Sequence, residues 1–142
     1  VECTGVLAGD DGRFCKLFRM TNVANSPYRF EWDKRELFQV YREMEDRGWG
    51  YRAVYHSHTH TPAFPSPTDV RMAAWPEAYY IIVSLQDKAS PVLRAFRINA
   101  ALAEGYPRRQ QGEAQEAFER RVLAWGGVAE VPLEVVEGEG KL

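Results

Sequence analysis

Cysteine is scarce in this chain of 142 residues, which contains only Cys3 and Cys15. The two form neither a CxxC pair nor a regular framework, so a disulfide scaffold is not expected. We expect the protein in a reducing compartment, the cytoplasm. Long apolar runs are also missing. No stretch approaches the roughly 20 residues needed to span a bilayer, and no basic and apolar leader opens the chain, so we expect a soluble protein without a membrane partner.

An excess of charge of one sign is absent too. The formal net charge is -2, the calculated pI is about 6.0, and the lysines and arginines are spread along the chain. Nucleic acid is therefore not an expected partner. With 45% hydrophobic and 27% charged residues, the composition is that of one compact domain over residues 1–142.

The hydrophobic patterns predict alternating strands and helices. Strands are expected at residues 3–8, 14–20, 28–32, 51–56, 79–84 and 92–98. The clearest helix begins after Asp33, which stands three residues before Glu36 as in a capping box, and ends at Gly48. The pattern is typical of an α/β domain with a mixed β-sheet flanked by helices.

Residues 99–128 allow two interpretations. Apolar residues from Ala114 to Trp125 suit a helix, whereas residues 121–136 suit a hairpin across Gly126 and Gly127. We expect a helix to about Arg120, followed by that hairpin.

All three histidines lie in one stretch, YHSHTHTPAFPSPTD, at residues 55–69. His56 and His58 are two positions apart at the end of a predicted strand, so both imidazoles project from the same face. Two imidazoles on one face are half of a zinc site, and a zinc hydrolase typically adds a third protein ligand and leaves the fourth position to water.

Asp69 is the best candidate for the third ligand. A helix start is predicted at Ser66, Pro67 and Asp69, with serine at the N-cap and a carboxylate in the first turn. Ser66 and Asp69 could also be no more than a capping pair. His60 leaves open a site of three histidines, although Pro62 indicates that the strand has ended by then.

The pattern H-x-H-x(7)-S-x-x-D, fulfilled by His56, His58, Ser66 and Asp69, resembles the signature of the JAMM (MPN+) metalloproteases. The resemblance implies the JAMM/MPN fold, which is cytidine-deaminase-like. It also implies that the two histidines and Asp69 hold Zn²⁺, and that Ser66 stabilises the oxyanion.

Family members also carry a glutamate just ahead of a C-G-x-L-x-G-like strand. The segment ECTGVLAG at residues 2–9 is similar, with Thr4 inserted before the glycine. This resemblance implies that Glu2 is the general acid and base. Members have a helix before this strand, and this chain, which starts at Val1 without Met, is expected to lack it. Residues 99–128, which fall outside the resemblance, are expected to be a variable insertion.

The chain is most similar to the small bacterial (Mec-like) members of the family, which process ubiquitin-like sulfur-carrier proteins. That implies hydrolysis of the amide bond after the C-terminal Gly-Gly of such a carrier, with release of cysteine or a short peptide. An isopeptidase acting on another ubiquitin-like conjugate, and a non-catalytic MPN scaffold, are the alternatives. A zinc deaminase is not expected, because H-x-E with P-C-x-x-C is missing, as is the H-E-x-x-H of thermolysin-like proteases.

Overall fold

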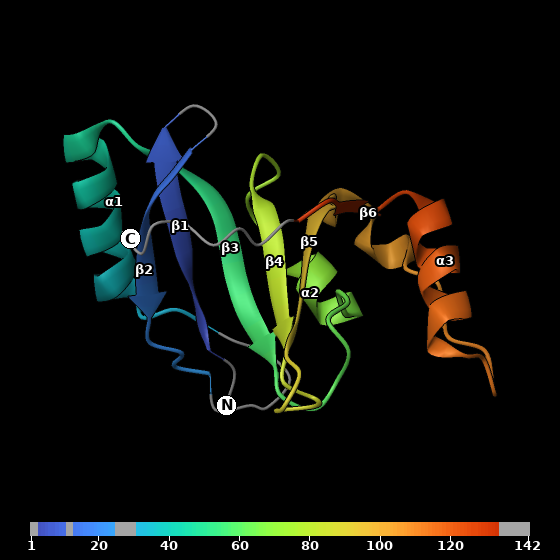
Figure 1. The fold of residues 1–142 in the computed structure, drawn as a ribbon. Coiled ribbons are helices and arrows are strands. Elements are labelled where there is room, and N and C mark those ends of the chain that lie inside the picture. Colours follow the sequence, from blue (N-terminus) through green and yellow to red (C-terminus); the bar gives the residue numbers. More distant parts are fainter. Residues whose placement is uncertain (1–2, 11–12, 25–30, 134–142) are drawn as a thin grey trace.

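The computed structural model describes residues 3–10, 13–24 and 31–133, which form one mixed β-sheet with helices (Figure 1). In chain order the elements are β1 (Thr4–Asp10), β2 (Arg13–Met20), α1 (Lys34–Arg47), β3 (Gly50–His58), α2 (Pro67–Arg71), β4 (Tyr79–Ser84), β5 (Val92–Ile98), the 3-10 helix η1 (Ala100–Gly105), α3 (Gln115–Trp125) and β6 (Val128–Val131). No helix among these residues is long and apolar enough to cross a membrane.

The sheet has six strands in the order β2-β1-β3-β4-β5-β6. Only β3 and β4 pair in parallel, and the other neighbours are antiparallel. The parallel pair needs a crossover, which the chain makes through the segment that contains α2. The expected α/β class with a mixed sheet is confirmed.

The helices cover one face of the sheet. Val6, Val54, Tyr80 and Phe96 are in register across β1, β3, β4 and β5, so their side chains share that face. Val6 packs in a cluster with α1, and the other three pack in a cluster with α2 and α3. Figure 1 shows α1 beside β2, and α3 at the opposite end of the sheet.

Helix α1 starts at the predicted cap. The Asp33 carboxylate accepts hydrogen bonds from the backbone N–H groups of Arg35 and Glu36. The Glu36 carboxylate accepts from Thr21 in the chain before the helix, so it ties α1 to the end of β2. Gly48 ends the helix with a φ of 69°, the left-handed conformation that glycine adopts without strain.

The hairpin predicted after Arg120 is wrong. Helix α3 continues to Trp125, and Gly126, with a φ of 94°, ends the helix instead of starting a turn between strands. Phe118 and Val122, four residues apart, are both buried in the core, as expected for neighbours on one face of a helix. Residue Val128 then begins β6, which pairs with β5.

The strand predicted at residues 28–32 falls mostly outside the described residues. Trp32 is described, and it forms an isolated bridge with Asn22. The other predicted strands correspond to β1, β2, β3, β4 and β5.

Candidate metal centre

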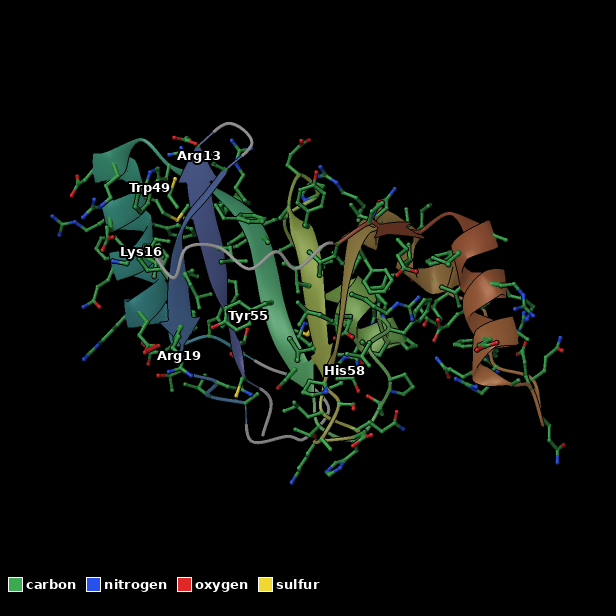
Figure 2. All side chains as sticks on the ribbon, in the orientation of Figure 1. Arg13, Lys16, Arg19, Trp49, Tyr55 and His58 are labelled. Carbon is green, nitrogen blue, oxygen red and sulfur yellow. The ribbon has the colours of Figure 1, made fainter. Side chains whose placement is uncertain are left out.

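Two histidines meet at the C-terminal end of β3. His56 and His58 are 2% and 5% exposed. They lie on the helix-covered face, and their Nε2 atoms are 3.1 Å apart. Figure 2 shows His58 at the end of the strand, close to the loop that leads to α2. As predicted, the alternation of side chains along the strand puts both imidazoles on one face, and Ser57, the residue between them, on the other.

The N-terminal cap of α2 positions Asp69 beside the two histidines. The Ser66 hydroxyl accepts a hydrogen bond from the Asp69 N–H at 3.1 Å, and the Asp69 carboxylate accepts from the Ser66 N–H at 2.9 Å. Pro67 occupies the first turn. This reciprocal capping box orients the carboxylate, because Asp69 Oδ2 accepts from the backbone N–H of the residue that caps the helix.

The loop between β3 and α2 is held at three places. The Ser84 hydroxyl donates to the carbonyl of Thr61 at 2.6 Å. Phe64 is buried in the core. The Tyr106 hydroxyl donates to the carbonyl of Pro65, also at 2.6 Å. The approach of α2 to β3 is therefore fixed by packing and hydrogen bonds on both sides of the loop.

The three side chains converge on one point. Asp69 Oδ1 lies 3.2 Å from His56 Nε2, and Asp69 Oδ2 lies 3.0 Å from His58 Nε2. One nitrogen or oxygen from each side chain lies within 4.8 Å of the others. Burial raises the pKa of the Asp69 carboxyl, but the charges and hydrogen bonds of the histidines outweigh it and hold that pKa far below its usual range. The carboxyl is thus an anion.

This donor set fits a divalent metal ion. His58 Nδ1 donates to the carbonyl of Pro62 at 2.8 Å, so in the neutral imidazole His58 Nε2 carries a lone pair. That nitrogen faces the Asp69 carboxylate and His56 Nε2, so a proton or a metal ion among the three atoms is favoured. A backbone carbonyl that fixes the tautomer of a histidine is the usual outer partner of a metal ligand.

His60 is not part of this group. Strand β3 ends at His58, and His60 is exposed in the following bend. Among the described residues, the ligand atoms that gather come from His56, His58 and Asp69. The geometry favours the histidine pair with Asp69 over a site of three histidines.

Ser66 keeps a hydrogen available for a second partner. Its oxygen accepts from the Asp69 N–H, which leaves the hydroxyl hydrogen free to donate. Ser66 and His58 line the same cavity, of about 610 Å³.

Glu2 lies outside the described residues. Cys3, next to it in sequence, is paired with Ser57: the Cys3 N–H donates to Ser57 Oγ at 2.8 Å, and the Ser57 N–H donates to the Cys3 carbonyl at 2.9 Å. Cys3 therefore lies alongside the residue between His56 and His58.

Sequence reasoning missed two residues that support the centre. Pro62 was interpreted only as the end of a strand, yet its carbonyl orients His58. Tyr106 lies in the stretch set aside as an insertion, and no motif pointed to it. Burial raises the pKa of its hydroxyl, and the nearby Asp69 carboxylate raises it further, so Tyr106 remains a hydrogen-bond donor to Pro65.

Comparison with known proteins identifies relatives of the N-terminal two thirds of the chain. A family model described as prokaryotic homologs of the JAB domain matches residues 1–99. The CysO-cysteine peptidase of Mycobacterium tuberculosis (strain ATCC 25618 / H37Rv) is 43% identical over 99 residues, which are 68% of this chain and 68% of the relative. A desampylase of Pyrococcus furiosus is 34% identical over 83 residues, which are 58% of this chain and 59% of the relative.

A solved structure has the same fold. The solution structure of protein DSY2949 from Desulfitobacterium hafniense is similar with a TM-score of 0.60 and 36% sequence identity. The similarity covers 68% of this chain and 69% of that one.

Proposed function

The chain belongs to the family of prokaryotic homologs of the JAB domain, and we propose that it is a zinc-dependent peptidase acting on a ubiquitin-like sulfur-carrier protein. It would hydrolyse the amide bond after the C-terminal Gly-Gly of the carrier and release cysteine or a short peptide. The observation that carries the proposal is the buried group of His56, His58 and Asp69 beside Ser66. The names of the relatives, a CysO-cysteine peptidase and a desampylase, support the class of substrate.

The proposed ligands suit zinc. Two imidazole nitrogens and one carboxylate oxygen make three protein ligands, which is the number that leaves a catalytic zinc one open position. When bound, Zn²⁺ supplies a Lewis acid that polarises the scissile carbonyl and makes water a nucleophile near neutral pH. Two features support the proposal: Pro62 fixes the tautomer of His58, and the capping box orients Asp69.

Ser66 and Glu2 would carry the remaining steps. The Ser66 hydroxyl would donate a hydrogen bond to the oxygen that gains negative charge in the transition state. Glu2 would take a proton from the attacking water and deliver it to the leaving amine. The pairing of Cys3 with Ser57 supports this role for Glu2, since Cys3, its neighbour in sequence, lies beside the residue between His56 and His58.

We further propose that residues 1–142 form one domain with residues 99–128 as its variable part. Residues 100–142 lie outside the stretch that the family model matches. The packing of Phe118 and Val122 into the common core supports their belonging to the same domain.

The test is mass spectrometry of a carrier that ends in Gly-Gly-Cys after incubation with the chain. We expect loss of the terminal cysteine. Glu2→Ala should abolish this hydrolysis while one zinc per chain stays bound, since Glu2 would handle protons and not the metal. Glu45→Ala, at an exposed position of α1, is the control and should cleave normally. Unchanged activity in Glu2→Ala would show that the general base is another group.

An isopeptidase is the second candidate. The similarity to desampylases favours it, and it would cleave the same carrier from a lysine side chain instead of from cysteine. Parallel assays with both kinds of conjugate separate the two. A folded chain that binds no zinc and cleaves neither conjugate would leave a non-catalytic scaffold.

A further inference from the structure

A cavity of about 610 Å³ opens beside the metal centre, and the part of the chain beyond the family match builds one of its walls. His58 and Ser66 lie at the wall formed by β3 and α2. Tyr106, Arg108 and Arg109, which connect η1 to α3, line it from the other side. A cavity of roughly 300–1,000 Å³ is of the size that holds small molecules.

The second wall is rigid. The Tyr106 hydroxyl is tied to the carbonyl of Pro65 at 2.6 Å. The ring of Tyr106 packs on Phe118 and Trp125 of α3, with centroids 6.1 and 5.6 Å apart. The guanidinium of Arg109 lies over the Phe118 ring at 4.4 Å and donates to the side chain of Gln115. The cavity is thus a built site, because each wall is held to the other.

The charge of the lining is positive. Arg71, Arg108 and Arg109 line the cavity together with one acidic residue, Glu104, so three positive charges and one negative charge leave a balance of +2. A cavity wall with this balance attracts an anionic group.

The three cavity arginines are exposed to solvent, and they differ in their partners from the half-buried Arg94 and Arg121 nearby. Arg94 pairs with two carboxylates and Arg121 pairs with Glu113. In contrast, Arg71 donates to a threonine hydroxyl of its own helix, and Arg109 to a carbonyl and an amide. Within the described residues, no carboxylate forms an ion pair with Arg71, Arg108 or Arg109.

We infer that this cavity holds the leaving group, and that its arginines bind the free α-carboxylate of the residue that is released. The inference rests on the proposed function and specifies which substrate the chain prefers. The amide C–N bond after the last glycine breaks, water adds its hydroxyl to the acyl carbon and its proton to the amine, and no co-reactant is needed. An amino acid with a free carboxylate fits this charge, whereas the backbone of a lysine conjugate offers amides on both sides. The chain therefore prefers a carrier extended by a C-terminal residue to an isopeptide conjugate.

The test compares two carriers that differ in one group. Both end in Gly-Gly-Cys, one with a free α-carboxylate and the other with a C-terminal amide, and kcat/KM is measured for each with the zinc-loaded full chain. We expect kcat/KM to be at least about tenfold higher for the free carboxylate, the effect of one or two charge-assisted hydrogen bonds.

Variants assign the preference to the cavity. In the double variant Arg71→Gln/Arg108→Gln, the ratio of the two kcat/KM values should fall to near one, mainly because the carboxylate substrate slows. Arg109 is left in place because it packs on Phe118. Arg120→Gln removes an arginine of α3 that does not line the cavity, and it should keep the ratio of the unaltered chain.

The outcomes separate the two proposals. Equal cleavage of both carriers by the unaltered chain would overturn the carboxylate site and leave the peptidase standing. A preference that survives in the double variant, with zinc content unchanged, would also overturn the assignment to these arginines. Cleavage of neither carrier would overturn the proposed function, and the inference with it.

Discussion

Asp69 and His60 are the residues that best separate the two possible ligand sets. Asp69 is buried against both other ligands, whereas His60 is exposed beyond the end of β3. We expect Asp69→Ala to weaken zinc binding by more than the roughly 10–100-fold that loss of an outer partner causes. His60→Ala should leave zinc affinity unchanged. Competition titration with a chromophoric chelator measures both, and the reverse order would favour a site of three histidines.

Ser66 has a structural and a proposed catalytic role, and one pair of variants can separate them. Ser66→Ala removes the cap of α2, at a cost of about 1 kcal/mol in the free energy of unfolding. It also removes the proposed oxyanion donor, so we expect kcat to fall by roughly 100-fold or more.

Ser66→Thr is the matched variant, because it keeps a hydroxyl that caps the helix and donates. It should retain most of the capping stability and a large part of the activity. Thermal unfolding and steady-state kinetics with zinc-loaded protein check this. If both variants lost activity only in proportion to lost stability, Ser66 would be a helix cap and nothing more.

At the scale of single residues, local chemistry allowed much of the candidate site to be predicted. Strand alternation placed His56 and His58 on one face, and the helix-start signal made Asp69 the best candidate for a third ligand, since each signal depends on a few neighbouring positions. The resemblance to the family signature then favoured this set over the alternative with His60. Pro62 and Tyr106 could not be found in this way. A backbone carbonyl carries no sequence signal, and Tyr106 reaches Pro65 across 41 positions of the chain.

Among the elements, the junction of η1, α3 and β6 depends on a tryptophan that packs between glycines. A Cβ added at Gly127 would meet the Trp125 ring at 2.1 Å, and one at Gly105 would meet its Nε1 at 2.8 Å. We expect Gly127→Ala to lower the free energy of unfolding by about 1–3 kcal/mol, as in other overpacked sites.

Gly50→Ala is the control for this substitution. Gly50 is the first residue of β3, as Gly127 directly precedes β6, but a Cβ built there meets nothing within 4 Å. Urea unfolding of both variants should show a loss of stability for Gly127→Ala alone. Because Trp125 packs on Tyr106, Gly127→Ala should also weaken the carboxylate preference of the cavity. Equal stability of the two variants would show that Trp125 moves aside freely.

The same junction explains where prediction of elements failed. Gly126 and Gly127 are compatible with a hairpin turn and with a helix end, and local pattern does not decide between them. The decision comes from tertiary contacts: Val122 is fully buried in the core beside β5, and β6 finds its partner in β5. Elements with their own start and stop signals, such as α1 between Asp33 and Gly48, were predictable without such contacts.

Over the whole molecule, the candidate metal centre adds a further link between parts of the fold that already share the core. His56 and His58 belong to the middle of the sheet, Asp69 to α2, and the loop between them is tied to η1 through Tyr106. A ligand that binds the folded chain and not the unfolded chain stabilises it by mass action. Zinc should therefore stabilise the whole domain and not only its own loop.

We expect zinc at about 100 times its Kd to raise the free energy of unfolding by about 2.7 kcal/mol. For a domain of this size, that corresponds to an increase in Tm of roughly 10 °C. Differential scanning calorimetry with zinc and with excess chelator measures the shift. Asp69→Ala should show little dependence on zinc, since its ligand set is incomplete, whereas Glu45→Ala should shift like the unaltered chain. A Tm that is the same with zinc and with chelator would mean that the buried histidines and Asp69 are balanced without a cation, and the metal-dependent mechanism would then lose its structural basis.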